Sequence, residues 1–271
     1  MAAHYVDAAG RSHAPAGTNA RIVSLVPSIT ELLFSLGLGE QVVGRTGFCI
    51  HPRTALRDVP KVGGTKDVKL DTLRSLNPTH VIVNVDENDR PTFEKIEDFA
   101  PHVIVTHPNM PEDNLELYRL LGGIFNARAR AEQLVAELQS ELDACRAVEW
   151  PDERVLYLIW KDPWMAVALD TYIARTLACV GWRVTLPPGG WSGMARYPVI
   201  PDISAEAHNV DRVLLSSEPF MFRSTHVAQL HGQLHVPADL IDGEMTSWYG
   251  SRAIRGLAYL RDFRAARLAG A

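Results

Sequence analysis

Short apolar runs alternate with amphipathic stretches along most of the chain. The first run, RIVSLV at 21–26, ends at Pro27, and a helical pattern of apolar residues then continues as far as the glycines at 37 and 39. A short apolar run that ends at a proline and gives way to a helical period predicts a buried strand followed by a helix. Ser28 and Glu31 stand three residues apart, which predicts a capping box at the start of that helix.

The same order of elements recurs along the chain. The stretches KLDTLRSLNPTHVIVNV (69–85) and TFEKIEDFAPHVIVTH (92–107) each predict a helix, a turn and a buried strand. Alternating β and α units favour a parallel sheet covered by helices. The order of elements at 21–107 recurs at 154–242, beginning with the apolar run RVLYLIW. The pattern therefore predicts an α/β protein with two similar lobes, each with a mainly parallel sheet.

Between the two halves, residues 126–149 have the pattern of one long helix. Apolar residues recur there at helical spacing, and neither glycine nor proline interrupts them. About 22 helical residues span roughly 33 Å, the width of a small domain. We therefore expect a Rossmann-like lobe at 1–125, a connecting backbone helix at 126–149 and a second such lobe at 150–271. Because a helix holds its ends at a nearly fixed angle, the lobes are expected to move little on ligand binding.

The loops after the predicted strands are rich in aromatic residues, above all in the second half. Such loops meet at the carboxyl ends of parallel strands, so two lobes are expected to enclose a ligand crevice between them. Aromatic side chains beside glycine and proline favour a rigid, flat-walled pocket for a large planar or amphipathic ligand; packing beneath long loops is the alternative. The aromatic candidates are Phe48, Trp160, Trp164, Trp191, Tyr197, Phe220, Phe222, Trp248 and Tyr249.

Two cations and one cysteine add candidate chemistry. Lys66 follows two glycines, where it could approach an anionic group, although a solvated lysine explains it equally well. Arg252 begins the last helical region, where its guanidinium could meet a carboxylate, an amide oxygen or a phosphate. Cys49 and His51 form a C-x-H motif, but no carboxylate motif accompanies it, so a structural metal is not expected. Ligation of a metal inside a bound cofactor by Cys49 is the remaining alternative.

Composition and missing motifs narrow the class of protein. The net charge of −5 and the pI of about 6.1 give no reason to expect a nucleic-acid partner. No apolar run approaches the roughly 18 residues of a membrane span. The N-terminus lacks the basic and apolar regions of a signal peptide, so the chain is expected to be unmarked for export. Nucleophile-elbow, P-loop, dinucleotide-binding and HExxH motifs are absent, so we expect neither an enzyme nor a resident cofactor.

The sequence resembles the periplasmic cobalamin-binding proteins of ABC importers, and more broadly the substrate-binding proteins for siderophores, haem and cobalamin. The resemblance rests on RIVSLVPSITELLFSLGLGEQVVG, on KVGG followed by LDTLRSLNPTHVIV, on the long helix, and on RVLYLIW followed by YIARTLACVGW. It implies two α/β lobes joined by a backbone helix. It also implies ligand contacts from Phe48, Trp160, Tyr197 and Arg252. Asn84 stands where a tryptophan is expected, so the wall of the first lobe is expected to be more polar.

The resemblance further implies a function, a partner and a location. The expected function is that of a monomeric, periplasmic substrate-binding protein that carries a corrinoid (cobalamin-like) or a related metal chelate, such as haem or a ferric siderophore, to an ABC transporter permease. This family docks on its transporter through an acidic residue on each lobe, and the matching positions are Asp71 and Asp202. The alternatives are a leaderless cytoplasmic chelate binder for storage, delivery or sensing, if Met1 is the native start, and an enzyme that uses the crevice.

Overall fold

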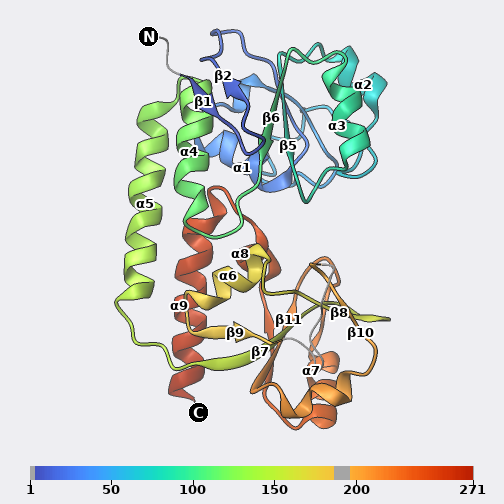
Figure 1. Ribbon diagram of the computed structural model, residues 1–271, viewed down its shortest axis with the longest axis vertical. Helices are drawn as coiled ribbons and strands as arrows, with labels where there is room; N and C mark the ends of the chain where they lie inside the picture. Colours follow the sequence, from blue (N-terminus) through green and yellow to red (C-terminus); the bar gives the residue numbers. More distant parts are fainter. Residues whose placement is uncertain (1–3, 186–195, 271) are drawn as a thin grey trace. The chain divides into compact units, whose positions relative to one another are not determined.

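The computed structural model describes residues 4–185 and 196–270 of the chain (Figure 1). It divides the chain into two units, each with its own sheet and helices. Unit 1 consists of residues 1–108, 112–139 and 249–252, and unit 2 consists of residues 109–111, 140–248 and 253–271. The expected α/β class is confirmed by these two sheets and their helices.

Unit 1 contains a four-stranded sheet in the order β4-β3-β5-β6. Its strands are β3 (Ile22–Ser24), β4 (Val42–Arg45), β5 (His80–Asn84) and β6 (His102–Thr106). All neighbouring pairs are parallel, as the alternation of apolar runs and helices predicts. Alternate side chains of the strands point to opposite faces, and the valines of β5 and β6 pack with Leu73 and Ile96 from two covering helices.

The helices of unit 1 are α1 (Pro27–Ser35), α2 (Leu70–Ser75), α3 (Arg90–Glu97) and α4 (Asp113–Ile124), with a short 3₁₀ turn η1 (Gly39–Gln41). The capping box predicted at Ser28 does not form. Helix α1 begins at Pro27, whose fixed φ suits the first helical position, so Val26 becomes the N-cap. The Glu31 carboxylate instead binds the Arg252 guanidinium, with N–O distances of 2.8 and 2.9 Å.

A small N-terminal hairpin, β1 (Tyr5–Val6) and β2 (Ser12–His13), was not expected from the sequence. Asp7 holds it to the main sheet of unit 1. One carboxylate oxygen of Asp7 accepts from the amides of residues 9 and 11, and the other accepts from the Val105 amide at 3.0 Å. The latter oxygen also lies 2.9 Å from His13 Nε2. The hairpin is therefore held in place by the hydrogen bonds of one buried carboxylate, and its strands lack the apolar run that usually indicates a strand in a sequence.

Residues 128–146 form one unbroken helix, α5 (Arg128–Arg146), within the stretch predicted at 126–149. Its buried positions are Ala131, Leu134, Leu138, Leu142 and Cys145, which recur at the expected helical spacing. The helix belongs to unit 1 as far as residue 139 and to unit 2 from residue 140.

Unit 2 contains a mixed sheet in the order β10-β8-β7-β11-β12, with β9 also pairing with β7. Its strands are β7 (Glu153–Trp160), β8 (Trp164–Ala166), β9 (Trp182–Val184), β10 (Val199–Ile200), β11 (Arg212–Ser216) and β12 (Ala238–Ile241). Strands β7, β9, β11 and β12 are parallel, as expected. The exception is β8, because the chain reverses direction directly after β7. Strand β8 therefore runs antiparallel to β7 and to β10.

The helices of unit 2 are α6 (Tyr172–Ala178), α7 (Ser224–Leu234), α8 (Gly243–Ser247) and, from residue 253 onward, α9 (Arg252–Ala269), with a 3₁₀ segment η2 (Ile203–His208). Leu230 and Leu234 of α7 pack against the strands β7 and β11. No helix among the described residues is both long and apolar enough to span a bilayer.

The four residues 249–252 belong to unit 1, although unit 2 precedes and follows them in the sequence. The Gly250 amide donates to Asn114 Oδ1 at 2.6 Å, and its carbonyl accepts from the Tyr118 hydroxyl at 2.8 Å. Ser251 bonds to Ser35 at 2.9 Å, and Arg252 pairs with Glu31. This short segment is therefore fastened to the helices α1 and α4 of unit 1.

Candidate functional site: the carboxyl ends of the strands

Exposed apolar side chains gather where the parallel strands end. In unit 1, Phe48 and Ile50 follow β4 and Val85 follows β5, with exposed fractions of 62%, 44% and 52%. In unit 2, Trp160 ends β7 and Met221 follows β11, with exposed fractions of 39% and 67%. Ligands of open α/β sheets bind at the carboxyl ends of the strands. These side chains therefore mark the candidate binding surface of each unit.

In unit 1 the Phe48 ring rests on a glycine. A Cβ added at Gly64 would lie 3.3 Å from Phe48 Cε2, so the missing side chain lets the ring lie against the backbone. The Gly47 amide donates to the Gly63 carbonyl at 2.7 Å, which ties the loop of Phe48 to the loop of Gly64. Gly63 itself has φ +102°, a conformation that favours glycine. Glycines thus set the position of the exposed ring.

The two polar candidates of unit 1 differ in exposure. Lys66 is exposed, and its Nζ donates to the Asp86 carbonyl at 2.7 Å. Asn84 is buried, and its Oδ1 accepts from the Asp86 and Glu87 amides at 2.8 and 3.3 Å. Its Nδ2 donates to Thr106 Oγ1 at 3.4 Å. Asn84 therefore shapes the turn after β5, and Lys66 stays available at its rim.

Cys49 lies beneath this surface. Its side chain is buried, and its Sγ is 3.1 Å from Thr30 Oγ1 and 3.2 Å from Thr46 Oγ1. Burial raises the pKa of the thiol above its usual value, despite its hydrogen bonds with the two threonines. With an exposed fraction of 1%, the side chain acts as a small core residue, which argues against metal ligation.

In unit 2 the aromatic candidates form a cluster. Trp160 meets Phe220 edge to face with ring centroids 5.7 Å apart, and Trp164 stacks on Phe222 at 6.1 Å. Phe220 and Phe222 lie 4.8 Å apart, and His226 lies against both at 5.6 and 5.5 Å. Edge-to-face and offset contacts of this kind are favourable for aromatic rings. The sequence-predicted residues Trp160, Trp164 and Phe220 are thus brought together.

Met221 stands at the tip of a tight turn between the two phenylalanines. The Phe222 amide donates to the Phe220 carbonyl at 3.0 Å, and the Phe220 amide donates to the Ile159 carbonyl at 3.3 Å. The rings on either side pack into the cluster, while the Met221 side chain remains exposed. A flexible thioether on a rigid support suits contact with an apolar ligand.

Trp248 belongs to the loop after β12, the strand next to β11. Its Nε1 donates to Glu218 Oε1 at 2.9 Å. Burial raises the pKa of the Glu218 carboxyl above its usual value, although hydrogen bonds from Ser247 and Trp248 oppose the shift. Glu218 thereby joins the loop of the aromatic cluster to the loop of Trp248.

The remaining candidates lie elsewhere. Tyr197 is 40% exposed and precedes the edge strand β10. Tyr249 and Arg252 are buried in unit 1, where Arg252 pairs with Glu31. Asp71 and Asp202 are both exposed, and Trp191 lies outside the described residues.

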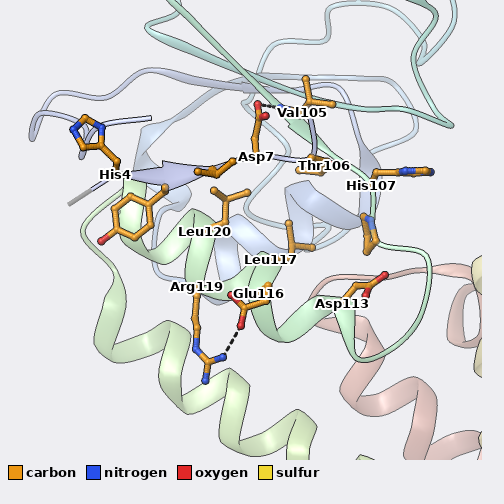
Figure 2. Close-up of a pocket in the computed structure, with 14 residues that line it drawn as sticks. His4, Asp7, Val105, Thr106, His107, Asp113, Glu116, Leu117, Arg119 and Leu120 are labelled. Atoms are coloured by element: carbon orange, nitrogen blue, oxygen red, sulfur yellow. Dashed lines mark hydrogen bonds and ion pairs between the residues drawn. The ribbon is translucent and has the colours of Figure 1, made fainter. Parts of the chain in front are cut away.

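A separate hollow of about 570 Å³ lies in unit 1 beside β1, the end of β6 and α4 (Figure 2). Leu117 and Leu120 from α4 and Val105 from β6 give it apolar walls. Its rim is polar and includes His107, which lies 3.6 Å from Asp86. None of the aromatic candidates lines it. Sequence reasoning missed this hollow because the N-terminal residues that form one wall have no apolar run.

A model of the periplasmic binding protein family matches residues 22–184. The chain belongs to this family. Its members are non-enzymatic substrate-binding proteins of transport. Among the described residues no three His, Cys, Asp or Glu side chains lie together so as to hold a metal ion.

Individual proteins that are similar in sequence are consistent with this family. The vitamin B12-binding protein of Vibrio campbellii is 22% identical over 218 residues, covering 80% of this chain and 74% of that protein. An uncharacterised ABC transporter substrate-binding lipoprotein, YvrC of Bacillus subtilis, is 27% identical over 183 residues, covering 60% of this chain and 57% of that protein.

Solved structures of periplasmic binding proteins share the fold. The periplasmic vitamin B12 binding protein BtuF of Vibrio cholerae has a TM-score of 0.76 at 15% identity, covering 92% of this chain and 98% of that one. The periplasmic heme-binding protein RhuT from Roseiflexus sp. RS-1, in apo form, has a TM-score of 0.74 at 22% identity, covering 92% and 97%. At these identities the likeness concerns the fold alone.

Three residues of the candidate binding surface were not predicted from the sequence as ligand contacts. They are Ile50, Val85 and Met221. Each directly follows a strand or lies in the loop after it. Their position after a strand was the sequence feature that could have indicated them. Aliphatic residues in loops are less distinctive in a sequence than tryptophans, and their exposure is decided by how the loop folds.

Proposed function

We propose that this protein is the substrate-binding protein of an ABC importer, acts in the periplasm, and carries a corrinoid or a related metal chelate such as haem or a ferric siderophore. The observation that carries the proposal is the exposed apolar side chains at the carboxyl ends of the strands in each unit, together with the aromatic cluster of unit 2. Large planar or amphipathic chelates bury apolar area on such rings, whereas small polar solutes do not.

The proposed ligand contacts are side chains at the surface that offer either apolar area or charge. Phe48 and Trp160 supply ring faces, and Met221 supplies a flexible apolar contact. Lys66 supplies a cation at the rim for an anionic group such as a propionate or a phosphate. Names of relatives that bind vitamin B12 or heme support this class of ligand.

Separate titrations with cyanocobalamin, haemin and a ferric siderophore test the proposal. Isothermal calorimetry and visible absorption should give one saturable site with a Kd of about 1 µM or tighter for at least one of the three, which corresponds to about −8 kcal/mol. Absence of binding to all three at concentrations up to about 100 µM would contradict the proposed ligand class.

A further inference from the structure

The loops that follow β11 and β12 are joined at several points. The two strands are parallel neighbours, with Ser216 opposite Ile241. The Ser217 amide donates to the Ile241 carbonyl at 3.0 Å, and the Gly243 amide donates to the Ser217 hydroxyl at 2.8 Å. These bonds hold the loop at 217–222 beside the segment at 242–248, which contains α8.

A carboxylate oxygen of Glu218 adds two further hydrogen bonds between these segments. Glu218 Oε1 accepts from the Ser247 hydroxyl and from Trp248 Nε1, each at 2.9 Å. An indole has a single N–H donor, so a bond to that donor fixes the direction in which the ring edge points. Glu218 thus fixes the direction of the Trp248 N–H toward the first loop.

The position of Glu218 carries an energetic cost. Burial and the nearby Asp242 and Glu244 disfavour its charged form. Glycine at 243 gives the carboxylate its room, because a Cβ there would lie 2.6 Å from Glu218 Cγ and 2.4 Å from Ser216 Oγ. The sequence therefore supplies both the buried acid and the space that the acid needs.

The loop of Glu218 is also the loop of the candidate binding surface. Phe220 and Met221 follow two and three residues after Glu218, and the Phe220 ring meets Trp160. A displacement of Glu218 would therefore disturb the aromatic cluster and Trp248 together.

We infer that Glu218 is a positioning residue for the ligand, one that orients the indole of Trp248 and locks the loops after β11 and β12 into one surface. The inference rests on the proposed function, since it assigns to Trp248 a contact with the chelate. Glu218 acts through Trp248 and the turn at Met221, without contacting the ligand itself.

A double-mutant cycle tests this role with cyanocobalamin and haemin as probes. Glu218→Ala should weaken binding about tenfold, because the indole loses its fixed direction. Glu218→Gln should stay within about threefold of wild type, because its amide oxygen can accept both hydrogen bonds. In a Trp248→Phe background, Glu218→Ala should cost less than about twofold, because no indole remains to be oriented. Equal losses in both backgrounds, or no loss in either, would overturn the inference.

A ligand-free readout separates this inference from the proposed function. The fluorescence difference between wild type and Trp248→Phe reports the environment of Trp248. Quenching of the Trp248 fluorescence by acrylamide should rise in Glu218→Ala and stay unchanged in Glu218→Gln. If wild type binds none of the chelates, the proposed function fails, whereas unchanged quenching in Glu218→Ala contradicts the orienting contact whatever the ligand.

Discussion

His80 begins β5 in unit 1, where its imidazole is buried and stacks on His102 with ring centroids 4.7 Å apart. Its Nδ1 lies 2.9 Å from Thr79 Oγ1, and its ring edge meets Phe125 at 5.1 Å. Burial first, and then the charges of His102 and His13, lower the pKa of His80 from 6.5 to about 4. A residue that looks unremarkable in the sequence thereby makes stability depend on pH.

The sign of this dependence follows from the lowered pKa. Between pH 6.5 and about 4 the unfolded state binds more protons at His80 than the folded state does, so stability falls as the pH falls through this range. The full loss at His80 is about 3 kcal/mol. Urea unfolding at pH 7, 5.5 and 4.5 should show a smaller loss for His80→Asn than for wild type. His235→Asn, at an exposed site, is the control, and an unchanged pH dependence in His80→Asn would contradict the assignment.

Trp160 allows binding to be separated from folding. It is 39% exposed, so Trp160→Ala should weaken chelate binding at least tenfold, about 1.4 kcal/mol, while the protein stays folded. Trp182 has an exposed fraction of 0% and packs on Phe263, so Trp182→Ala should cost about 3–5 kcal/mol of stability instead. Calorimetry and thermal unfolding of both variants check this. Unchanged binding in Trp160→Ala would remove Trp160 from the site.

At the scale of elements, the apolar runs located the parallel strands well, because buried strands need continuous apolar sequence. The pairing of β1 with β2 escaped prediction, since it depends on the long-range contact between Asp7 and the Val105 amide. The capping box predicted in α1 does not form, and the partner of Glu31 is instead Arg252, 221 residues away. The tryptophans identified the aromatic cluster, but only the folded loops revealed that Glu218 holds Trp248.

Two helical glycines should respond to alanine in opposite directions. A Cβ at Gly123 in α4 would lie 2.1 Å from the Tyr5 ring, so Gly123→Ala should displace β1 and cost about 1–3 kcal/mol. Nothing lies within 4 Å of a Cβ at Gly232 in α7, so Gly232→Ala should stabilise by about 0.5–1 kcal/mol. Chemical unfolding of the two variants measures both effects. Equal effects would show that helix propensity alone governs them.

At the scale of the whole molecule, the expected docking acids are open to test. Asp71 lies in the first turn of α2, and the Asp202 carboxylate accepts from the Ser204 amide at 2.9 Å as the N-cap of η2. Both side chains are exposed. Asparagine keeps an N-cap while removing the charge, so the substitution isolates the electrostatic contribution.

Asp71→Asn combined with Asp202→Asn should slow association with the reconstituted importer about tenfold and reduce its dependence on salt. Surface plasmon resonance at two salt concentrations provides the measurement. Asp98→Asn, which removes an exposed charge elsewhere on unit 1, is the control. Association rates equal to wild type in the double variant would remove the docking role from these residues.

The fastening of residues 249–252 to unit 1 has a consequence for biosynthesis. A ribosome adds about 5–20 residues per second, so roughly 5–20 s separate the emergence of residue 139 from that of residue 252. Throughout that interval Glu31 lacks its guanidinium partner, and Tyr118 lacks the Gly250 carbonyl. The first half of the nascent chain therefore cannot complete its native contacts until residues 249–252 have emerged.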